Sequence, residues 1–398
     1  MTDTVVFPQD RTCPYEPAPG YEALAGQRPL GHATLYDGRR VWAVTGRAMA
    51  RKLLVDPRIS SDRTNPAWPM MFAIIAATVS DVEQKVMKIV TSLVGVDGPV
   101  HNARRKMLIP SFTIRRINAM RPKIQEIVDR RLDSMLERGA PADLIPEFAS
   151  PVPLTVLYHL MGIPSEDHEF FQKKSQQLAG GANANEAYDV LMDYMDKLIA
   201  EKRRNPDGGV LTDLLTEYGE ADQEELISTL VLQVAAGHGT TGTMISLSLF
   251  ALLQNPDQLA ELRANPSLMP TAVDELMRLL SIPDGISRLA IEDIEVDGTT
   301  IHKGDGVFFI TSLINRDEEV YEQPNSLSWQ RTSVRDHVSF GFGAHQCLGQ
   351  NVARATLEIA LGTLLDRLPN LRLATPADKI PFNPTAGFQV LNKLPVTW

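Results

Sequence analysis

Cys347 is the residue whose surroundings most clearly indicate chemistry, in the segment GFGAHQCLGQ at residues 341–350. It directly precedes QNVARATLEIALGTLLDRL, whose leucines form an apolar stripe at helical spacing, so the cysteine lies at or near a helix N-terminus. Unpaired amides and the helix dipole favour a thiolate there. The glycines at 341, 343 and 349 allow positive φ and let backbone N–H groups approach the sulfur. A thiolate in such a loop suits the axial position on a haem iron, although a cysteine taken at random is more often an inert buried thiol.

Composition sets broad limits on this chain of 398 residues. With 43% hydrophobic and 22% charged residues it can bury a large core. Its net charge of −10 argues against nucleic acid as the main partner. Two cysteines far apart make neither a disulfide framework nor a zinc site, and the first residues show neither a secretory signal nor a membrane anchor. We therefore expect a cytoplasmic protein, and a monomer because nothing indicates an oligomer.

Helical periodicity dominates after a short hairpin in which Asp37-Gly38 forms the turn. Apolar residues at spacings of three and four predict helices at 120–138, 185–204, 222–254, 256–264, 270–280 and 351–367. Strands are predicted at 293–296, 300–310 and 384–396. No repeat or long linker divides the chain, so the sequence predicts one mainly α domain over residues 1–398 with small β-sheets.

The stretch 226–253 is long and apolar enough to suggest a membrane span on length alone. Polar residues are spread around it, which is typical of a helix that crosses the centre of a large core. Its middle holds Gly237, Gly239 and Gly242, and each glycine costs a helix interior roughly 1 kcal/mol relative to alanine. Close approach of a flat ligand would explain them, with the Thr240 hydroxyl turned to a local backbone carbonyl or to water, opening the helix hydrogen bonds there.

The segment FGFGAHQCLG at 340–349 resembles the cysteine-loop signature of the cytochromes P-450, the haem-thiolate monooxygenases, at each of its fixed positions. Further stretches resemble family motifs in the expected order. They are HNARR at 101–105, AAGHGTT at 235–241, ELMR at 275–278, SRLA at 287–290 and WQR ending at Arg331. The resemblance implies the cytochrome P-450 fold, a large helical region around haem with small β-sheets.

The resemblance also implies a role for each matched residue. Cys347 would be the thiolate ligand of the iron in haem b, and Glu275, Arg278 and Arg331 would form a buried structural triad. By spacing alone, Glu275 and Arg278 would be an ordinary surface pair. Thr240 and Thr241 would serve catalysis, with Thr240 holding the proton network. The haem would be contacted by His101, Arg105, Arg288, His345, Phe340, Gly349 and Ala236.

Gly239 departs from the family pattern, because the family usually has an acid at this position of the central helix. The acid helps to relay protons to bound dioxygen, so its loss removes one candidate relay group. His238 is adjacent, but neighbouring helix positions face different ways. A water chain could replace the acid, oxygen use could be poorly coupled with leakage of peroxide, or the reaction could need no relay. The last case includes nitric oxide reduction and peroxide-driven oxidation.

The resemblance also sketches a substrate pocket. Its expected residues are Met70, Met71, Phe72, Leu232, Ile282, Asp284, Ile286 and Phe388. Methionine and aromatic side chains suit a large apolar ligand, although such runs are more often plain core. The Asp284 carboxylate would either bind a polar group of the substrate or point to solvent.

Three functions are compatible with the sequence. The favoured one is a monooxygenase of secondary metabolism that uses dioxygen to hydroxylate a bulky apolar natural product or xenobiotic, such as a macrolide, a statin-like polyketide or a terpenoid. Its electrons would come from NAD(P)H through a ferredoxin reductase and a ferredoxin, for which the basic cluster between Arg104 and Lys123 offers a docking face. The second is nitric oxide reduction or peroxide-driven oxygenation, supported by Gly239. The third is a non-catalytic haem protein that recruits a partner, against which Thr240 argues.

Overall fold

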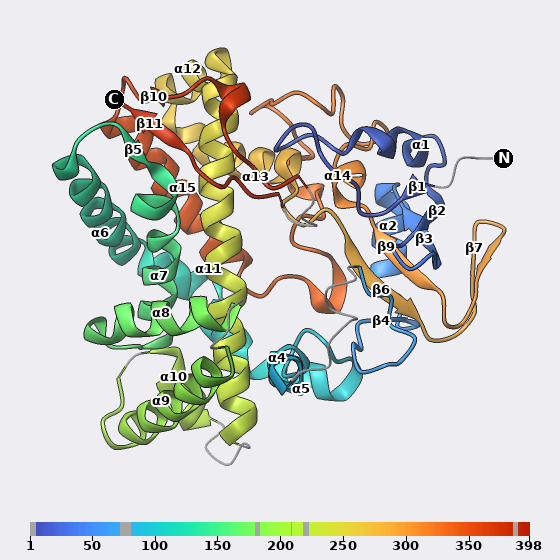
Figure 1. Ribbon diagram of the computed structural model, residues 1–398, viewed down its shortest axis with the longest axis horizontal. Helices are drawn as coiled ribbons and strands as arrows, with labels where there is room; N and C mark the ends of the chain where they lie inside the picture. Colours follow the sequence, from blue (N-terminus) through green and yellow to red (C-terminus); the bar gives the residue numbers. More distant parts are fainter. Residues whose placement is uncertain (1–4, 72–80, 180–183, 208, 218–222, 385–388) are drawn as a thin grey trace.

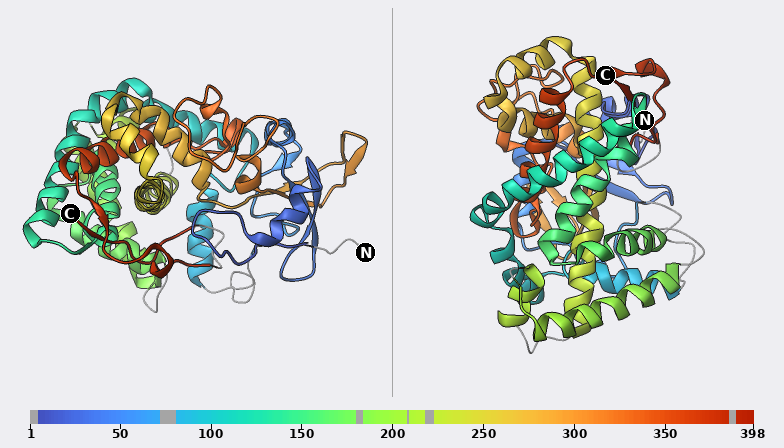
Figure 2. Two further views of the ribbon diagram at one scale, coloured as in Figure 1. Left: turned by 90° about the horizontal axis from the view of Figure 1, so that it is seen from above. Right: turned by 90° about the vertical axis from the view of Figure 1, so that its left-hand side faces the viewer.

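α11 (Gln223–Gln254) crosses the middle of the molecule and is the element around which the other helices are arranged. Figure 1 shows it running through the structure, and Figure 2 shows it end-on with the other elements around it. The computed structural model describes residues 5–71, 81–179, 184–207, 209–217, 223–384 and 389–398. Within these ranges, no helix is long and apolar enough to cross a membrane. The apolar residues of α11 instead pack in the main core, mostly against α7 (Pro151–Met161) and α15 (Gln350–Arg367).

Helices make up most of the molecule, as the sequence predicts. Besides α7, α11 and α15 the longer ones are α2 (Arg47–Leu54), α4 (Asp81–Thr91), α5 (Gly98–Leu108), α6 (Ile114–Arg138), α8 (His168–Ala179), α9 (Ala184–Arg204), α10 (Val210–Glu217), α12 (Pro256–Ala264) and α13 (Met269–Leu280). Short helices are α1 (Glu22–Ala25) and α14 (Thr311–Ile314). Each of the six predicted helices is present. The sequence analysis missed α2, α4, α5, α7, α8 and α10.

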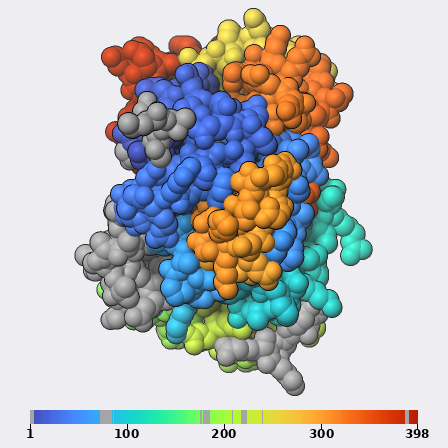
Figure 3. Space-filling model, turned by 90° about the vertical axis from the view of Figure 1, so that its right-hand side faces the viewer, coloured from blue at the N-terminus to red at the C-terminus, as the bar shows by residue number. Residues whose placement is uncertain are grey.

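The described residues also form three small sheets. The largest has the order β1-β2-β3-β9-β6-β4, with β1 (Val5–Val6), β2 (Leu30–Thr34), β3 (Arg40–Val44), β9 (Gly306–Phe309), β6 (Ile286–Ala290) and β4 (Ile59–Ser60). The second has the order β10 (Arg372–Leu373), β11 (Pro395–Thr397) and β5 (Ala142–Asp143). β7 (Ile294–Val296) and β8 (Thr299–Ile301) form a hairpin, which Figure 3 shows in front of the N-terminal segments.

The strand predictions are confirmed in part. β2 and β3 pair antiparallel across the predicted turn, where Gly38 has φ 81°. The predicted strand at 300–310 is two strands, β8 and β9, because the chain turns at Gly304, which has φ 92°. Of the predicted strand at 384–396, the described part pairs only at Leu391 and in β11.

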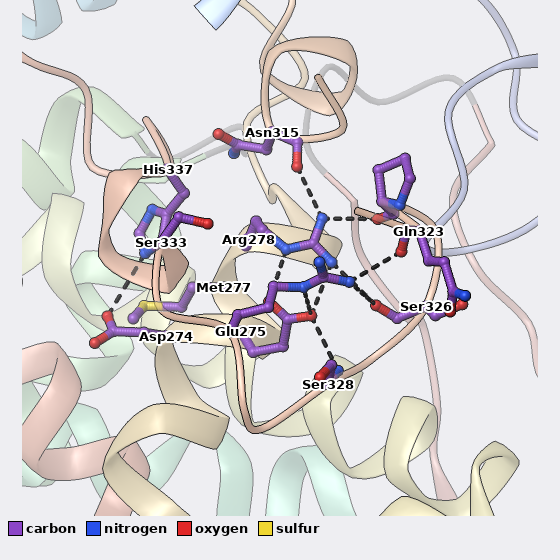
Figure 4. Close-up of polar contacts among 12 residues, drawn as sticks. Asp274, Glu275, Met277, Arg278, Asn315, Gln323, Ser326, Ser328, Ser333 and His337 are labelled. Atoms are coloured by element: carbon purple, nitrogen blue, oxygen red, sulfur yellow. Dashed lines mark hydrogen bonds and ion pairs between the residues drawn. The ribbon is translucent and has the colours of Figure 1, made fainter. Parts of the chain in front are cut away.

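A buried ion triad joins α13 to the loop that follows α14. Arg278 donates from Nε to Glu275 Oε2 at 2.7 Å and from Nη2 to Oε1 at 2.9 Å, and Arg331 Nε donates to the same Oε1 at 2.8 Å. The Glu275 and Arg278 side chains are completely buried. Arg278 also donates to the carbonyl oxygens of Asn315, Pro324 and Ser326 (Figure 4). The triad therefore holds an irregular loop by its backbone, and the surface-pair alternative for Glu275 and Arg278 is wrong.

A second carboxylate, Asp274, lies next to the triad and was missed by the sequence analysis. It accepts from Arg335 Nε at 2.9 Å and from Arg354 Nε at 2.7 Å, and His337 Nε2 lies 3.5 Å away. Although burial opposes ionisation, His337 and Arg354 lower the pKa of Asp274 to about 2. Arg354 belongs to α15, and its guanidinium stacks on the Phe340 ring at 4.6 Å. Asp274 thus links α13 to the segment that precedes Cys347.

Replacement of Glu275 by glutamine is expected to destabilise the fold. Because two buried guanidinium groups would lose their countercharge, the free energy of unfolding should fall by about 3–5 kcal/mol. Denaturant unfolding measures this change. The matched control is Glu261→Gln, an exposed carboxylate paired with Gln330, which should cost less than about 0.5 kcal/mol. Equal losses in the two variants would contradict a structural role for the triad.

Asp274 should make stability depend on pH at the acid end. Its pKa in the folded protein, about 2, lies below the ordinary value of 3.8. The stabilisation is therefore fully present above about pH 4 and is lost as the pH falls toward 2. We expect the difference in free energy of unfolding between the wild type and Asp274→Asn to shrink by about 2 kcal/mol over this interval. A difference that is constant with pH would show that the carboxylate is not ionised by its partners.

Candidate functional site

A cavity of about 390 Å³ lies between α11, α7, α5 and the loop that leads into α15. Its wall is mostly apolar. The apolar residues are Leu93, Val94, Phe112, Pro153, Val156, Leu157, Leu232, Ala236, Met244, Met277, Ile282, Pro283, Ile286, Phe340, Leu348, Val352, Ala353 and Leu357. Cys347 lines the same cavity. Cys347 therefore borders a space that can hold an apolar molecule.

The loop around Cys347 has the form that its glycines predict. The Cys347 backbone N–H donates to the Phe340 carbonyl at 2.8 Å, and Gly341 and Gly343 have φ 68° and 77°. A side chain at Gly343 would meet the Leu54 carbonyl oxygen at 2.7 Å, so this glycine also lets the loop pack on the end of α2. Gly349 has φ −78° and is the N-cap of α15. The expectation of positive φ at Gly349 is wrong, because the chain there already turns into the helix.

The Cys347 thiol is open to the cavity and enclosed elsewhere. Burial raises the pKa of this thiol. A hydrogen bond from the Gly349 amide and the charges of Arg105 and Arg354 lower it, but they do not offset burial. The amide contact thus acts in the expected direction, toward the thiolate, and burial acts against it. A positive charge bound in the cavity, such as a metal ion, would be needed to hold the sulfur as a thiolate.

Four of the predicted haem contacts have basic side chains and line this cavity: His101, Arg105, Arg288 and His345. The rings of His101 and His345 lie 4.0 Å apart. Arg105 Nη2 donates to the Gln346 carbonyl at 2.6 Å, and burial lowers the pKa of Arg288 to about 10, which still leaves it charged. These side chains are suited to bind an anionic group that enters the cavity.

Asp97 is a member of this group that the sequence analysis missed. Its Oδ1 lies 2.8 Å from His345 Nε2, and its Oδ2 accepts from Ser60 Oγ at 2.5 Å and from the Ser61 amide at 2.7 Å. Burial opposes ionisation of Asp97, but these hydrogen bonds lower its pKa to about 2. Asp97 is therefore ionised at neutral pH and fixes the orientation of the His345 ring. The only sequence signal was its place directly before α5.

α11 runs without interruption through its glycine-rich middle, so the predicted opening of its hydrogen bonds is absent. Thr240 Oγ1 donates to the Ala236 carbonyl at 3.0 Å, as predicted for this hydroxyl. Thr241 Oγ1 donates to Gly237 at 2.9 Å. Thr240, Thr241 and Ala236 all line the cavity.

The glycines of α11 have different reasons to be glycine. A side chain at Gly237 would meet Leu157 at 2.8 Å, and one at Gly242 would meet the Ala149 carbonyl at 2.8 Å. These two positions permit close packing of α11 on neighbouring chain segments, and Gly237 also lines the cavity, where the sequence analysis expects a ligand. At Gly239 a β-carbon would meet no atom within 4 Å. The structure therefore has room for a side chain at the position where an acid is expected.

The predicted substrate pocket is present in part. Leu232, Ile282 and Ile286 line the cavity, whereas Met70 and Met71 do not. Phe72 and Phe388 lie outside the described residues.

Asp284 does not face the cavity, so neither of its expected roles is found. Asp284 Oδ2 lies 2.7 Å from Arg11 Nη2, and both side chains are buried. The sequence analysis could not anticipate this partner, because Arg11 is far away along the chain. The analysis also missed cavity residues of α7, such as Val156 and Leu157, and the polar Gln233 of α11.

Four members of the basic cluster between Arg104 and Lys123 form ion pairs with acidic residues. Arg104 pairs with Glu225 and Arg116 with Asp213. The other pairs are Arg121 with Glu358 at 2.8 Å and Lys123 with Glu126 at 2.9 Å, and Arg105 faces the cavity. The cluster is thus less positive than the sequence suggests.

Comparisons with known proteins agree with this fold. The family model described as Cytochrome P450 matches residues 180–394. The chain is 53% identical to pentalenic acid synthase of Streptomyces avermitilis, over 99% of this chain and 97% of that protein. It is 50% identical to cytochrome P450-SOY of Streptomyces griseus, over 98% and 94% of the two chains. The structure of mycinamicin VIII C21 methyl hydroxylase MycCI from Micromonospora griseorubida, bound to mycinamicin VIII, matches with a TM-score of 0.87 and 36% identity, over 99% of this chain and 100% of that one. The chain therefore belongs to the cytochrome P450 family and is an oxidoreductase of the monooxygenase type.

Proposed function

We propose that this protein hydroxylates a bulky apolar natural product or xenobiotic in its central cavity, as a haem-thiolate monooxygenase. The observation that supports this most strongly is the combination of Cys347, four basic side chains and a large apolar wall around one space. The reaction consumes dioxygen and two electrons, and it leaves one oxygen atom in the product and one in water. Residues 1–398 act as one functional unit in this proposal.

The residues of the cavity fit a haem. The family implies a haem whose iron is bound by a cysteine thiolate, and the Cys347 side chain opens toward the cavity. We assign the thiolate to Cys347 and the carboxylate contacts to His101, Arg105, Arg288 and His345. Phe340, Gly349 and Ala236 line the same cavity and are assigned as apolar contacts of the haem. When bound, the haem supplies the activation of dioxygen, and its iron supplies the positive charge that a buried thiolate needs.

Thr240 is assigned to proton delivery. Its hydroxyl donates to Ala236 within its own helix and faces the cavity. A rotation about χ1 would let the same hydroxyl hold a water or donate into the cavity. Thr241 donates to Gly237 and supports the same stretch of helix. Because Gly239 carries no acid, ordered water must supply the protons along this path.

Terpenoids and macrolides are the proposed substrate classes. The names of the relatives point to secondary metabolism, since one makes pentalenic acid and another hydroxylates mycinamicin VIII. Leu232, Ile282, Ile286 and the residues of α7 offer an apolar surface to such molecules.

Electrons are proposed to come from NAD(P)H through a ferredoxin reductase and a ferredoxin. Because four members of the basic cluster have acidic partners, we expect docking there to be weak and sensitive to salt. The protein is proposed to work in the cytoplasm as a monomer.

A second candidate function is supported by Gly239. A β-carbon at this position would meet no atom within 4 Å, so the glycine is not required by close packing at its Cα. A reaction that needs no acid, namely nitric oxide reduction or peroxide-driven oxygenation, is the alternative.

Titration of the ferric haem protein with cyclic terpenoids and macrolide lactones tests the proposed function. We expect a saturable low-spin to high-spin shift of the Soret band with one class, because a bulky apolar ligand displaces water from the cavity. The ferrous carbonyl spectrum controls for thiolate ligation. Thiolate ligation without any spin shift would contradict the substrate class and favour small-molecule chemistry or a non-catalytic role.

Gly239→Asp separates the two candidate functions. For a monooxygenase, an added acid should lower the peroxide released per NADPH by up to roughly 10-fold, well below the contribution of a fully positioned general acid. Gly239→Asn is the matched control, with similar size and no proton to relay. If the Asp and Asn variants change the peroxide released per NADPH equally, the change results from packing and not from proton transfer. Loss of an existing peroxide-driven activity in Gly239→Asp alone would favour the alternative.

A further inference from the structure

Gln233 is a polar side chain of the cavity wall that differs from most of the other polar lining residues in its location and its hydrogen bonding. Most of the other polar lining residues belong to the Cys347 loop, to α15 or to the basic group next to them. The hydroxyls of Thr240 and Thr241 already donate to backbone carbonyls. The Gln233 amide, in contrast, makes no hydrogen bond to any residue that the structure describes.

The position of Gln233 on α11 fixes its distance from Thr240. Residues 233, 236, 237, 240 and 244 all line the cavity, and their spacing of three or four places them on one face of the helix. Gln233 and Thr240 are seven residues apart, which is about 10 Å along the axis at 1.5 Å per residue. Between them this face carries only Ala236 and Gly237. A ligand can therefore lie along α11 with one end at each polar side chain.

The surroundings of Gln233 are apolar. Leu232 is its neighbour in the wall, Val156 and Leu157 of α7 face the same cavity, and so do Leu93 and Val94 after α4. A primary amide covered by an apolar ligand would lose water without regaining a hydrogen bond, which is unfavourable. A ligand that carries a polar group at this point would restore the hydrogen bond. Such an arrangement discriminates strongly against analogues that lack the group.

We propose that Gln233 is a specificity-determining residue that hydrogen-bonds a hydroxyl or carbonyl oxygen of the substrate. The substrate is then a bulky apolar molecule with a polar group roughly 10 Å from the carbon that is held beside Thr240. This inference rests on the proposed function, since it takes Thr240 to mark the reacting end of the cavity.

Matched imidazole ligands test the inference on the haem protein. The probes are 1-alkylimidazoles and 1-(ω-hydroxyalkyl)imidazoles of increasing chain length, in which the ring nitrogen ligates the iron and the chain extends into the cavity. The Soret shift gives Kd for each pair. In the wild type the hydroxyl should strengthen binding within one window of chain length, relative to shorter and longer members. In Gln233→Met this preference should fall by about 5-fold within that window, the factor expected for one hydrogen bond.

Two further variants control the experiment. Gln254→Leu makes a comparable change at an exposed position of the same helix and should keep the wild-type preference. Gln233→Leu repeats the test with a second apolar side chain in case the methionine fills the cavity. Neither variant of Gln233 removes a hydrogen bond between described residues, so thermal unfolding should remain close to that of the wild type.

The outcomes separate this inference from the proposed function. Loss of the hydroxyl preference in both Gln233 variants, with alkylimidazoles still bound, supports the inference. An unchanged preference at every chain length, with the same ligands bound, overturns it. Failure of the proposed function has another signature, which is the absence of a thiolate-type carbonyl spectrum or of any imidazole shift in the wild type.

Discussion

Two adjacent buried carboxylates, Asp274 and Glu275, are the constraint on which the geometry around Cys347 depends. A buried charge is tolerated only when it is paired and hydrogen-bonded. Each carboxylate therefore pairs with two arginines, of which only Arg278 lies close by in the sequence, in the same helix as Glu275. The guanidinium of Arg278 in turn takes its remaining acceptors from the backbone of the loop after α14 (Figure 4). The loop after α14 is thus held in one conformation by hydrogen bonds to its backbone, although it lacks regular secondary structure where Arg278 binds it.

This constraint reaches the site through α15. Arg354 joins Asp274 on one side and stacks on Phe340 on the other. The Phe340 carbonyl accepts the Cys347 amide proton, so three contacts connect Cys347 to the buried carboxylate of Asp274. In the Cys347 loop itself, Asp97 orients His345 in a similar way. Ionised carboxylates therefore hold both the sulfur loop and the basic groups, and each does so from outside the cavity.

Local signals explain what could be predicted from the sequence. The Cys347 loop, the helix after it and the Thr240 hydrogen bond depend on neighbouring residues, and the sequence predicts all three. α7 was missed because nearly every residue in it is buried, so it carries no amphipathic stripe. Asp97, Asp274 and Asp284 were missed or misassigned for another reason. The partners cited for these three carboxylates are 35 or more positions away along the chain, and sequence spacing does not predict such pairs.

α11 shows how one helix can combine packing and recognition. Gly237 and Gly242 are small because α7 and the chain before it approach closely, whereas Gly239 is small with space around it. A β-carbon at Gly242 would meet a fixed backbone carbonyl, one at Gly237 would meet the end of the Leu157 side chain, and one at Gly239 would meet no atom within 4 Å. The same helix carries Gln233 about 10 Å from Thr240, with only small residues between them on the cavity face. Because the helix is rigid, the separation of these two polar side chains is fixed. It selects substrates by the distance between their polar group and the reacting carbon, and this selectivity does not require the cavity wall to change shape.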